Sequence, residues 1–171
     1  MTTTNAFAPL HASNPFYACL MAAKRDEVLG LAEQLAEGWQ LSPLQASGIS
    51  ENGLALLQWQ DSVMHQRFFL GEIPISSAAL AMTDSHGKSY EGGAIIMKED
   101  SQLVQAIAVM DIVWRHQLPG FEQIAKLVAT GALVRSQNDS VRKQILARTR
   151  VDFSLLSSTE ESPLSQDSGR K

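Results

Sequence analysis

The chain has 171 residues, a length that favours one domain able to bury its own core. Its formal net charge is −4 and 19% of its residues are charged, which gives no reason to expect a nucleic-acid partner. No apolar run approaches the roughly 20 residues that a membrane helix needs. Cys19 is the one cysteine, and no secretory signal is evident, so we expect a soluble, cytoplasmic protein.

The two ends of the chain differ in composition from its middle. Residues 1–13 are rich in Thr, Ala and Asn and are expected to be a flexible N-terminus. Residues 157–171 are rich in Ser and contain Pro163 and Gly169, a composition typical of a disordered tail. The sequence therefore predicts a single folded domain at residues 14–156.

Two helices are predicted at the start of this domain. Asn14 followed by Pro15 combines a capping side chain with a proline at the first helical position. Asp26 and Glu27 then open a second helix, because acidic side chains favour the positive end of the helix dipole. Gly38 is a plausible end for this second helix.

The middle of the chain changes to the period of extended structure. The predicted extended segments are 54–60, 67–70 continuing in 73–82, and 89–97. Pro74 has no backbone donor, so it marks an edge or a bulge in its segment. The run from Asp84 to Gly87 is a hairpin turn signal. These features predict an antiparallel meander of about four strands.

Helical spacing returns after Asp100 or Ser101, either of which could cap a helix. Its apolar positions extend around most of the circumference, which indicates a buried helix. Pro119 and Gly120 end it, and two shorter helices are predicted near 122–129 and 133–149. The order of helices, strands and helices predicts an α+β fold.

Generic signatures of catalysis and metal binding are absent from the sequence. It has no glycine-rich phosphate loop, no paired-cysteine metal site and no zinc-protease helix motif. The histidines are scattered and are interpreted as surface or loop residues: His11, His65, His86 and His116. We therefore predict no catalytic residue, no metal site and no cofactor bound by this chain alone. Cys19, on an apolar helical face, is interpreted as a buried, inert thiol.

Gly92 and Gly93 leave two interpretations open. They could allow close backbone approach to a ligand or a neighbouring chain. The interpretation that we favour is a bulge or packing against the long helix.

A basic cluster lies late in the chain, opposed only by Asp139. Its members are Arg135, Arg142, Lys143, Arg148 and Arg150. Guanidinium groups suit phosphate or phosphonate oxygens, so Arg135, Arg142 and Lys143 are candidate contacts for such a group. The alternative is a solvated helix face or an ion-pairing interface.

The run from Arg67 to Glu72, with sequence RFFLGE, is the most unusual local segment. Its two adjacent aromatics point to opposite faces of a strand, so one can fill the core while the other packs on a helix layer or a partner. Glu72 has no evident carboxylate or histidine partner in the sequence, so we assign it no catalytic role.

These segments, in their order along the chain, resemble the PhnG subunit family of the carbon–phosphorus lyase system. The residues that carry the resemblance are RFFxGE at 67–72, Ala78-Ala79, Thr83-Asp84, Gly92, Asp111 and Arg150-Val151-Asp152-Phe153. The paired N-terminal helices agree with it, and the resemblance covers about residues 14–156.

The resemblance implies a transferase subunit that is active only within a multi-subunit complex for phosphonate catabolism. The implied partners are PhnI-type, PhnH-type and PhnJ-type subunits, with a PhnL-type ATPase also required. Together they would displace adenine from ATP with an alkylphosphonate, giving ribose 1-alkylphosphonate 5-triphosphate. The later radical step belongs to the PhnJ-type subunit, whose cysteine-bound cluster a chain with one cysteine could not supply. Purified alone, this chain is expected to form a homodimer.

The chain departs from the family pattern at several polar positions. Ser76, Ser77 and Ala81 stand where arginines are usual in the second strand run. The segment 97–100 (Met-Lys-Glu-Asp) replaces a usual Gly-Arg-Asp, and Leu103 and Gln105 replace a common His and Glu. The chain is therefore identified as a divergent member.

Three hypotheses follow. The first is an accessory subunit, in which Arg67, Glu72, Arg150 and Asp152 make interface or structural polar contacts. The second is a stand-alone binding module for a small phosphorylated ligand, which would use the late basic cluster. The third is a free-standing enzyme, which the lack of a nucleophile–base or metal motif disfavours.

Overall fold

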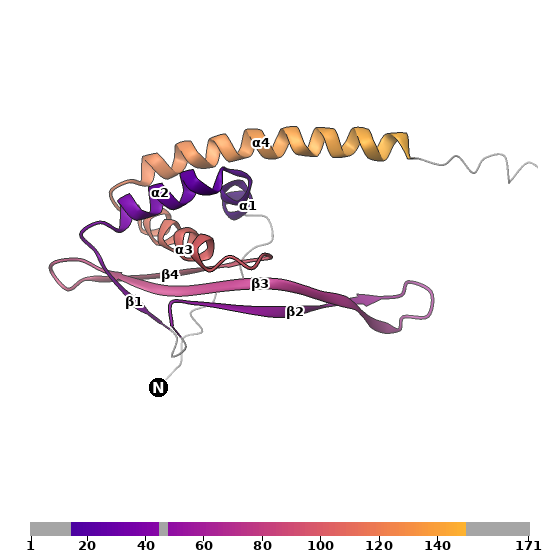
Figure 1. Cartoon of the computed structure of the whole chain (residues 1–171), viewed down its shortest axis with the longest axis horizontal. Helices are drawn as coiled ribbons and strands as arrows, with labels where there is room; N and C mark the ends of the chain where they lie inside the picture. Colours follow the sequence, from indigo (N-terminus) through magenta and orange to yellow (C-terminus); the bar gives the residue numbers. More distant parts are fainter. Residues whose placement is uncertain (1–14, 45–47, 150–171) are drawn as a thin grey trace, which may run out of the picture. The chain divides into compact units, whose positions relative to one another are not determined.

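The computed structural model describes residues 15–44 and 48–149. The chain divides into two compact units, with the boundary between Arg135 and Ser136. The described part of the first unit has two helices, four antiparallel strands, a buried helix and the beginning of a last helix, so the predicted α+β class is confirmed (Figure 1).

The first two helices are α1 (Pro15–Ala22) and α2 (Arg25–Ala36). Pro15 is the first residue of α1, as its fixed φ predicts. Asp26 and Glu27 lie in the first turn of α2, where their charge suits the helix dipole. Each helix buries one apolar side; the residues are Phe16, Cys19 and Leu20 in α1 and Val28, Ala32 and Leu35 in α2. The prediction that Cys19 is buried is confirmed.

The strands form one antiparallel sheet centred on β3. Their bounds are β1 (Gln40–Pro43), β2 (Ser50–Gln60), β3 (Arg67–Thr83) and β4 (Ser89–Ile96). One edge of β3 pairs with β2 over residues 67–78 and with β1 over 80–83. Its other edge pairs with β4 over 76–83 only. The predicted meander is therefore confirmed as β2, β3 and β4, while β1 was not predicted because its four residues, QLSP, show no apolar alternation.

Helix α3 (Ser101–His116) lies on β3 and β4 and supplies much of the core. Asp100 is its N-cap, since its side chain accepts a hydrogen bond from the N–H of Leu103. Ten of its sixteen residues are buried, which confirms the prediction of a buried helix. A Cβ added to Gly92 would lie 2.6 Å from Ile112 Cγ1, so the glycine allows α3 to approach β4 closely. The packing interpretation of Gly92 is confirmed.

The last helix, α4 (Phe121–Arg148), is continuous. The prediction of two shorter helices, at 122–129 and 133–149, is wrong in this respect. Gly131 lies between these two ranges and within the continuous helix. A Cβ at this position would overlap the carbonyl oxygen of Cys19, so the close packing of α4 on α1 requires a glycine here. The missing side chain thus serves the contact between α1 and α4 and does not mark a helix end.

The second unit, residues 136–171, is described here as far as Thr149, and the described side chains of this unit are all exposed. Across the described segments of both units, none of the helices combines the length and hydrophobicity that a membrane crossing requires.

Candidate functional site

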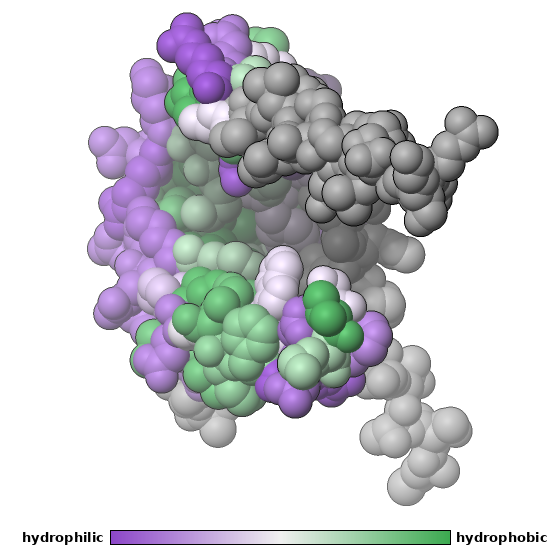
Figure 2. All heavy atoms as spheres, turned by 90° about the vertical axis from the view of Figure 1, so that its right-hand side faces the viewer, coloured by the Kyte–Doolittle hydropathy of each residue, from purple (hydrophilic) through white to green (hydrophobic). Residues whose placement is uncertain are grey.

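The sheet has a two-stranded extension formed by β2 and β3. Beyond the pair of Asn52 and Ser76, β2 and β3 continue together to the turn that joins them, whereas the pairing of β4 with β3 stops at Ser76. We call residues 53–75 the arm (Figure 1). Its exposed large hydrophobic residues are Leu54, Leu56, Leu57, Trp59, Val63, Met64, Phe68, Phe69 and Leu70. Figure 2, which faces the end of the arm, shows hydrophobic side chains gathered there.

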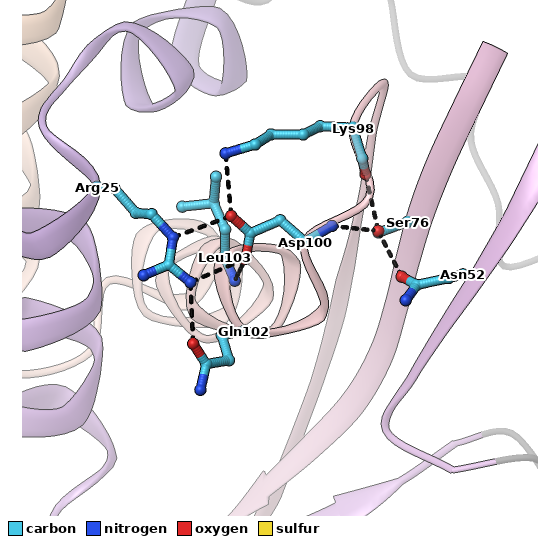
Figure 3. A network of polar contacts seen from close by, with 7 residues as sticks. All are labelled: Arg25, Asn52, Ser76, Lys98, Asp100, Gln102 and Leu103. Carbon is cyan, nitrogen blue, oxygen red and sulfur yellow. Dashed lines mark hydrogen bonds and ion pairs between the residues drawn. The ribbon is translucent and has the colours of Figure 1, made fainter.

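Ser76 is the centre of a polar network at the base of the arm (Figure 3). The residue is fully buried, and its Oγ lies 2.6 Å from Asn52 Oδ1 and 2.8 Å from the carbonyl oxygen of Lys98. The N–H of Asp100 donates to the same Oγ at 2.9 Å. Because a hydroxyl has one proton, Ser76 donates to one of its two acceptors at a time. The network joins β2, β3 and the start of α3.

Asp100 extends this network to α2. Arg25 donates from Nε to Oδ2 at 2.9 Å and from Nη2 to Oδ1 at 3.0 Å, which is a bidentate pair. Lys98 Nζ lies 3.0 Å from Oδ2, and the N–H of Leu103 donates to Oδ1 at 3.1 Å. Hydrogen bonding to Arg25, and then to Lys98 and Leu103, holds the pKa of the Asp100 carboxyl well below its usual range.

Two further contacts connect the first residues of β2 to α3. Gln105 Nε2 donates to Ser50 Oγ at 2.7 Å, and Ser101 Oγ donates to Asn52 Oδ1 at 3.1 Å. Both residues of β2 lie at or just before the point where the arm leaves the sheet. The orientation of the arm's base is therefore fixed by hydrogen bonds that join β2, β3 and the start of α3.

A second buried polar centre lies under the helices, at Asp111 of α3. The residue is 3% exposed, and its carboxylate accepts from Tyr17 Oη at 2.7 Å and from the N–H of Gly93 at 3.2 Å. Arg115 Nη2 donates to both of its oxygens, at 3.1 and 2.9 Å. Burial, with the adjacent Asp111 carboxylate, raises the pKa of Tyr17 to about 12. The carboxylate is thus bonded to α1, α3 and β4.

Arg67 and Glu72, both predicted as polar contacts, lie on β3 within the arm. A register shift leaves Leu70 without a partner on β2, so Arg67 pairs with Gln60 and Glu72 pairs with Leu56. Gln60 and Leu56 are an even number of residues apart, so the bulge places Arg67 and Glu72 on the same face. Both side chains are exposed, and neither has a hydrogen bond or ion pair to the described residues.

The other predicted site residues are dispersed. Arg135, Arg142 and Lys143 are exposed on α4, where their role as phosphate contacts stays a prediction. Arg150 and Asp152 lie outside the described residues.

The two polar networks position the strands and helices that they join. Ser76 and Asp111 are buried and bonded on all sides, and the described histidines, His65, His86 and His116, are exposed and do not contact either network. Within 15–44 and 48–149, no three His, Cys, Asp or Glu side chains gather as metal ligands. The two networks hold the arm and α3 in place. The surface that the arm itself exposes is mainly hydrophobic.

The model of the family described as phosphonate metabolism protein PhnG matches residues 14–157. The chain belongs to the PhnG family. The match includes every element of the sheet, the arm and α1 to α4. No curated protein matches the chain. Membership in this family connects the protein to phosphonate metabolism.

The departures of this PhnG-family protein from the pattern noted in its sequence lie largely in the network at the base of the arm. Ser76 is its centre, Asp100 forms ion pairs with both Arg25 and Lys98, and Gln105 donates to Ser50. Ser76 and Gln105, two of these departures, are thus neutral members of a network whose charged members are Arg25, Lys98 and Asp100.

Sequence reasoning missed Arg25, Asn52 and Tyr17 as members of these networks. Asn52 is followed by Gly53, and an Asn-Gly pair usually indicates a turn. Asn52 was therefore not expected to lie within a strand. Tyr17 bonds Asp111 across 94 positions, a separation over which one sequence carries no pairing signal.

Proposed function

We propose that this PhnG-family chain is an accessory subunit of the carbon–phosphorus lyase core complex, which displaces adenine from ATP with an alkylphosphonate. The product would be ribose 1-alkylphosphonate 5-triphosphate. The proposed partners are PhnI-type, PhnH-type and PhnJ-type subunits, and the chain binds no cofactor by itself. Because the reaction consumes ATP, the proposal places the complex in the cytoplasm.

The observation that carries the proposal is the arm. Trp59 is 57% exposed and Phe69 is 60% exposed on a hairpin that no third strand supports in the described part of the chain. An isolated two-stranded hairpin is at best marginally stable in water. A chain that extends such a hairpin from a well-packed core is suited to work in contact with another chain.

Reconstitution tests this function. A complex assembled from all its subunits should release adenine from ATP in the presence of methylphosphonate, measured by chromatography. Omission of this chain should abolish the release, and addition of the purified chain should restore it. Unchanged adenine release in the complex that lacks the chain would refute an accessory role.

A second function is supported by the exposure of Arg135, Arg142 and Lys143 on α4. These side chains could hold a small phosphorylated ligand on the isolated chain. Calorimetry separates the two functions: the subunit proposal predicts no binding of ATP or methylphosphonate by the chain alone. Saturable binding that the substitutions Arg142→Ala and Lys143→Ala remove would favour a stand-alone binding module.

The oligomeric state of the purified chain is also open to measurement. We expect a homodimer when the chain is purified alone, because two exposed arms can cover each other in part. Light scattering coupled to size-exclusion chromatography reports the mass directly.

A further inference from the structure

The arm has two open edges as well as two open faces. Over residues 67–75, β3 pairs with β2 on one side and with no described strand on the other. Over residues 53–60, the outer edge of β2 is likewise without a described partner. Unpaired edges are rows of free N–H and C=O groups that readily accept another strand.

The hydrophobic residues are divided between the two faces by the register of β2 and β3. Trp59 lies opposite Phe68 on one face, with Leu57, Ile73 and Ile75 on the same face. Leu54, Leu56 and Phe69 lie on the other face, together with Arg67 and Glu72. A solvated antiparallel ribbon would alternate apolar with polar residues, so this pattern indicates that both faces are covered in the working state.

The exposed area agrees with a specific interface. The nine exposed large hydrophobics of the arm have exposed fractions from 41% at Leu57 to 82% at Val63. Three of the nine are aromatic, Trp59, Phe68 and Phe69, and an aromatic side chain can bury on the order of 150–250 Å². A standard interface takes roughly 800 Å² from each partner, an area to which the exposed residues of both faces and of the turn would contribute together.

A second copy of the chain could cover only part of this surface. An arm that packs face to face on its copy leaves its other face open, and an arm that pairs edge to edge leaves both faces open. A groove in a larger chain can cover both faces and an edge at once. This geometry favours a different, larger partner over a copy.

We infer that the arm inserts into an apolar groove of a larger partner subunit, and this inference rests on the proposed function. The groove would be apolar on both walls, with a carboxylate opposite Arg67 and a cation opposite Glu72, since both charges lie on one face of the arm. The partner of this chemistry to be tested is the PhnI-type subunit.

The network at the base of the arm explains how such an insertion is prepared. Asn52 and Ser50 are bonded to α3, Ser76 is bonded to Asp100 at the N-cap of α3, and Asp100 is bonded to Arg25 of α2. The base of the hairpin is therefore held in one direction before the partner arrives, which lowers the ordering cost of association.

The test uses the full chain co-expressed with the PhnI-type subunit and analysed by size-exclusion chromatography. The first variant carries Trp59→Ser and Phe68→Ser, and the second replaces residues 54–74 by a two-residue Asn-Gly turn. The matched control is Leu133→Ser, because Leu133 is 67% exposed but lies on α4. Far-UV circular dichroism and thermal unfolding show whether each variant keeps the fold. Titration of the purified subunits then gives the dissociation constants.

We expect the wild-type chain and the control variant to co-elute with the partner, and both arm variants to bind at least tenfold more weakly. Co-elution of both arm variants at wild-type affinity would overturn the inference and leave the proposed function intact. Arm variants that lose a homodimer yet keep full partner binding would assign the arm to a second copy and would also overturn it. A wild-type chain that never co-elutes would overturn the inference and the proposed function together.

Discussion

At the scale of single residues, Asp100 does two things at once. Its carboxylate caps α3 through the N–H of Leu103 and accepts charged hydrogen bonds from Arg25 and Lys98. These donors all favour the ionised form, so the pKa of Asp100 is lowered in the folded chain. The side chain thereby couples the start of α3 to α2, beside the base of the arm.

This lowered pKa predicts an acid-dependent loss of stability. A carboxyl with a depressed folded pKa contributes stability above its unfolded pKa of about 3.9, and the contribution is lost as the pH falls below that value. The free energy of unfolding of the wild-type chain should therefore exceed that of the Asp100→Asn variant at pH 6, and the difference should shrink toward pH 2. Urea unfolding at several pH values measures it, with Asp139→Asn as the control. A difference independent of pH would contradict this role.

Tyr17 gives a prediction at the alkaline end. Because its folded pKa is about 12, the folded chain keeps the phenol proton between pH 10 and 12 while the unfolded chain loses it. The stability that this tyrosine contributes is therefore lost as the pH rises through that interval. Absorbance at 295 nm should show a tyrosine ionisation near pH 12 that disappears in Tyr17→Phe and moves to lower pH in Asp111→Asn. A late ionisation that persists in Tyr17→Phe would belong to another group.

Asp111 should also be costly to remove. The substitution Asp111→Ala leaves the Tyr17 hydroxyl and the N–H of Gly93 without their acceptor and should lower the free energy of unfolding by about 2–4 kcal/mol. Chemical unfolding followed by circular dichroism is the measurement. A loss below about 0.5 kcal/mol, the range of neutral surface changes, would show that the centre does not matter for stability.

At the scale of elements, helix packing makes opposite demands on two glycines. A Cβ at Gly131 of α4 would overlap the backbone of Cys19 in α1, whereas a Cβ at Gly30 of α2 meets nothing within 4 Å. Alanine is favoured over glycine within a helix by about 1 kcal/mol, but backbone overlap forces the helices apart and typically costs about 1–3 kcal/mol.

We therefore predict that Gly30→Ala raises the thermal midpoint and that Gly131→Ala lowers it. The expected net changes are about +0.5 kcal/mol for Gly30→Ala and about −1 to −2 kcal/mol for Gly131→Ala. Differential scanning calorimetry on the two variants measures both. Equal and positive shifts would show that α1 and α4 are not in the described contact.

The sequence predicts these elements better than it predicts their contacts. The buried helix, the Pro15 start and the turn at Asp84 follow from local rules, and the structure confirms them. Of the two cap candidates, Asp100 and Ser101, the structure selects Asp100. β1 is too short to show the alternation of apolar and polar residues that indicates a strand. The role of Gly131 within α4 depends on a tertiary contact that the sequence does not reveal. The networks around Ser76 and Asp111 join residues distant in sequence, so only the fold could identify their members.

For the candidate site, the RFFxGE segment that the sequence singled out lies within the arm. The RFFxGE motif marked the arm, but the bulge at Leu70 that places Arg67 and Glu72 on one face depends on the pairing with β2. The apolar character of both faces of the arm likewise emerges only from this register. Arg150 and Asp152 stay predictions.

At the scale of the whole molecule, a well-packed core carries an arm of exposed hydrophobic residues. The core has the buried residues and bonded polar centres of a stable domain, whereas the arm has surface that water solvates poorly. A protein of this kind is expected to reach its functional state in an assembly. Family membership connects the protein to phosphonate metabolism.

The most direct test of this central claim is the mass of the species that forms when the chain is co-expressed with the PhnI-type subunit, measured by light scattering on a sizing column. The account predicts one peak that contains both chains and a mass equal to a whole-number combination of the two. Two separate peaks, each with the mass of one chain or its own oligomer, would contradict it.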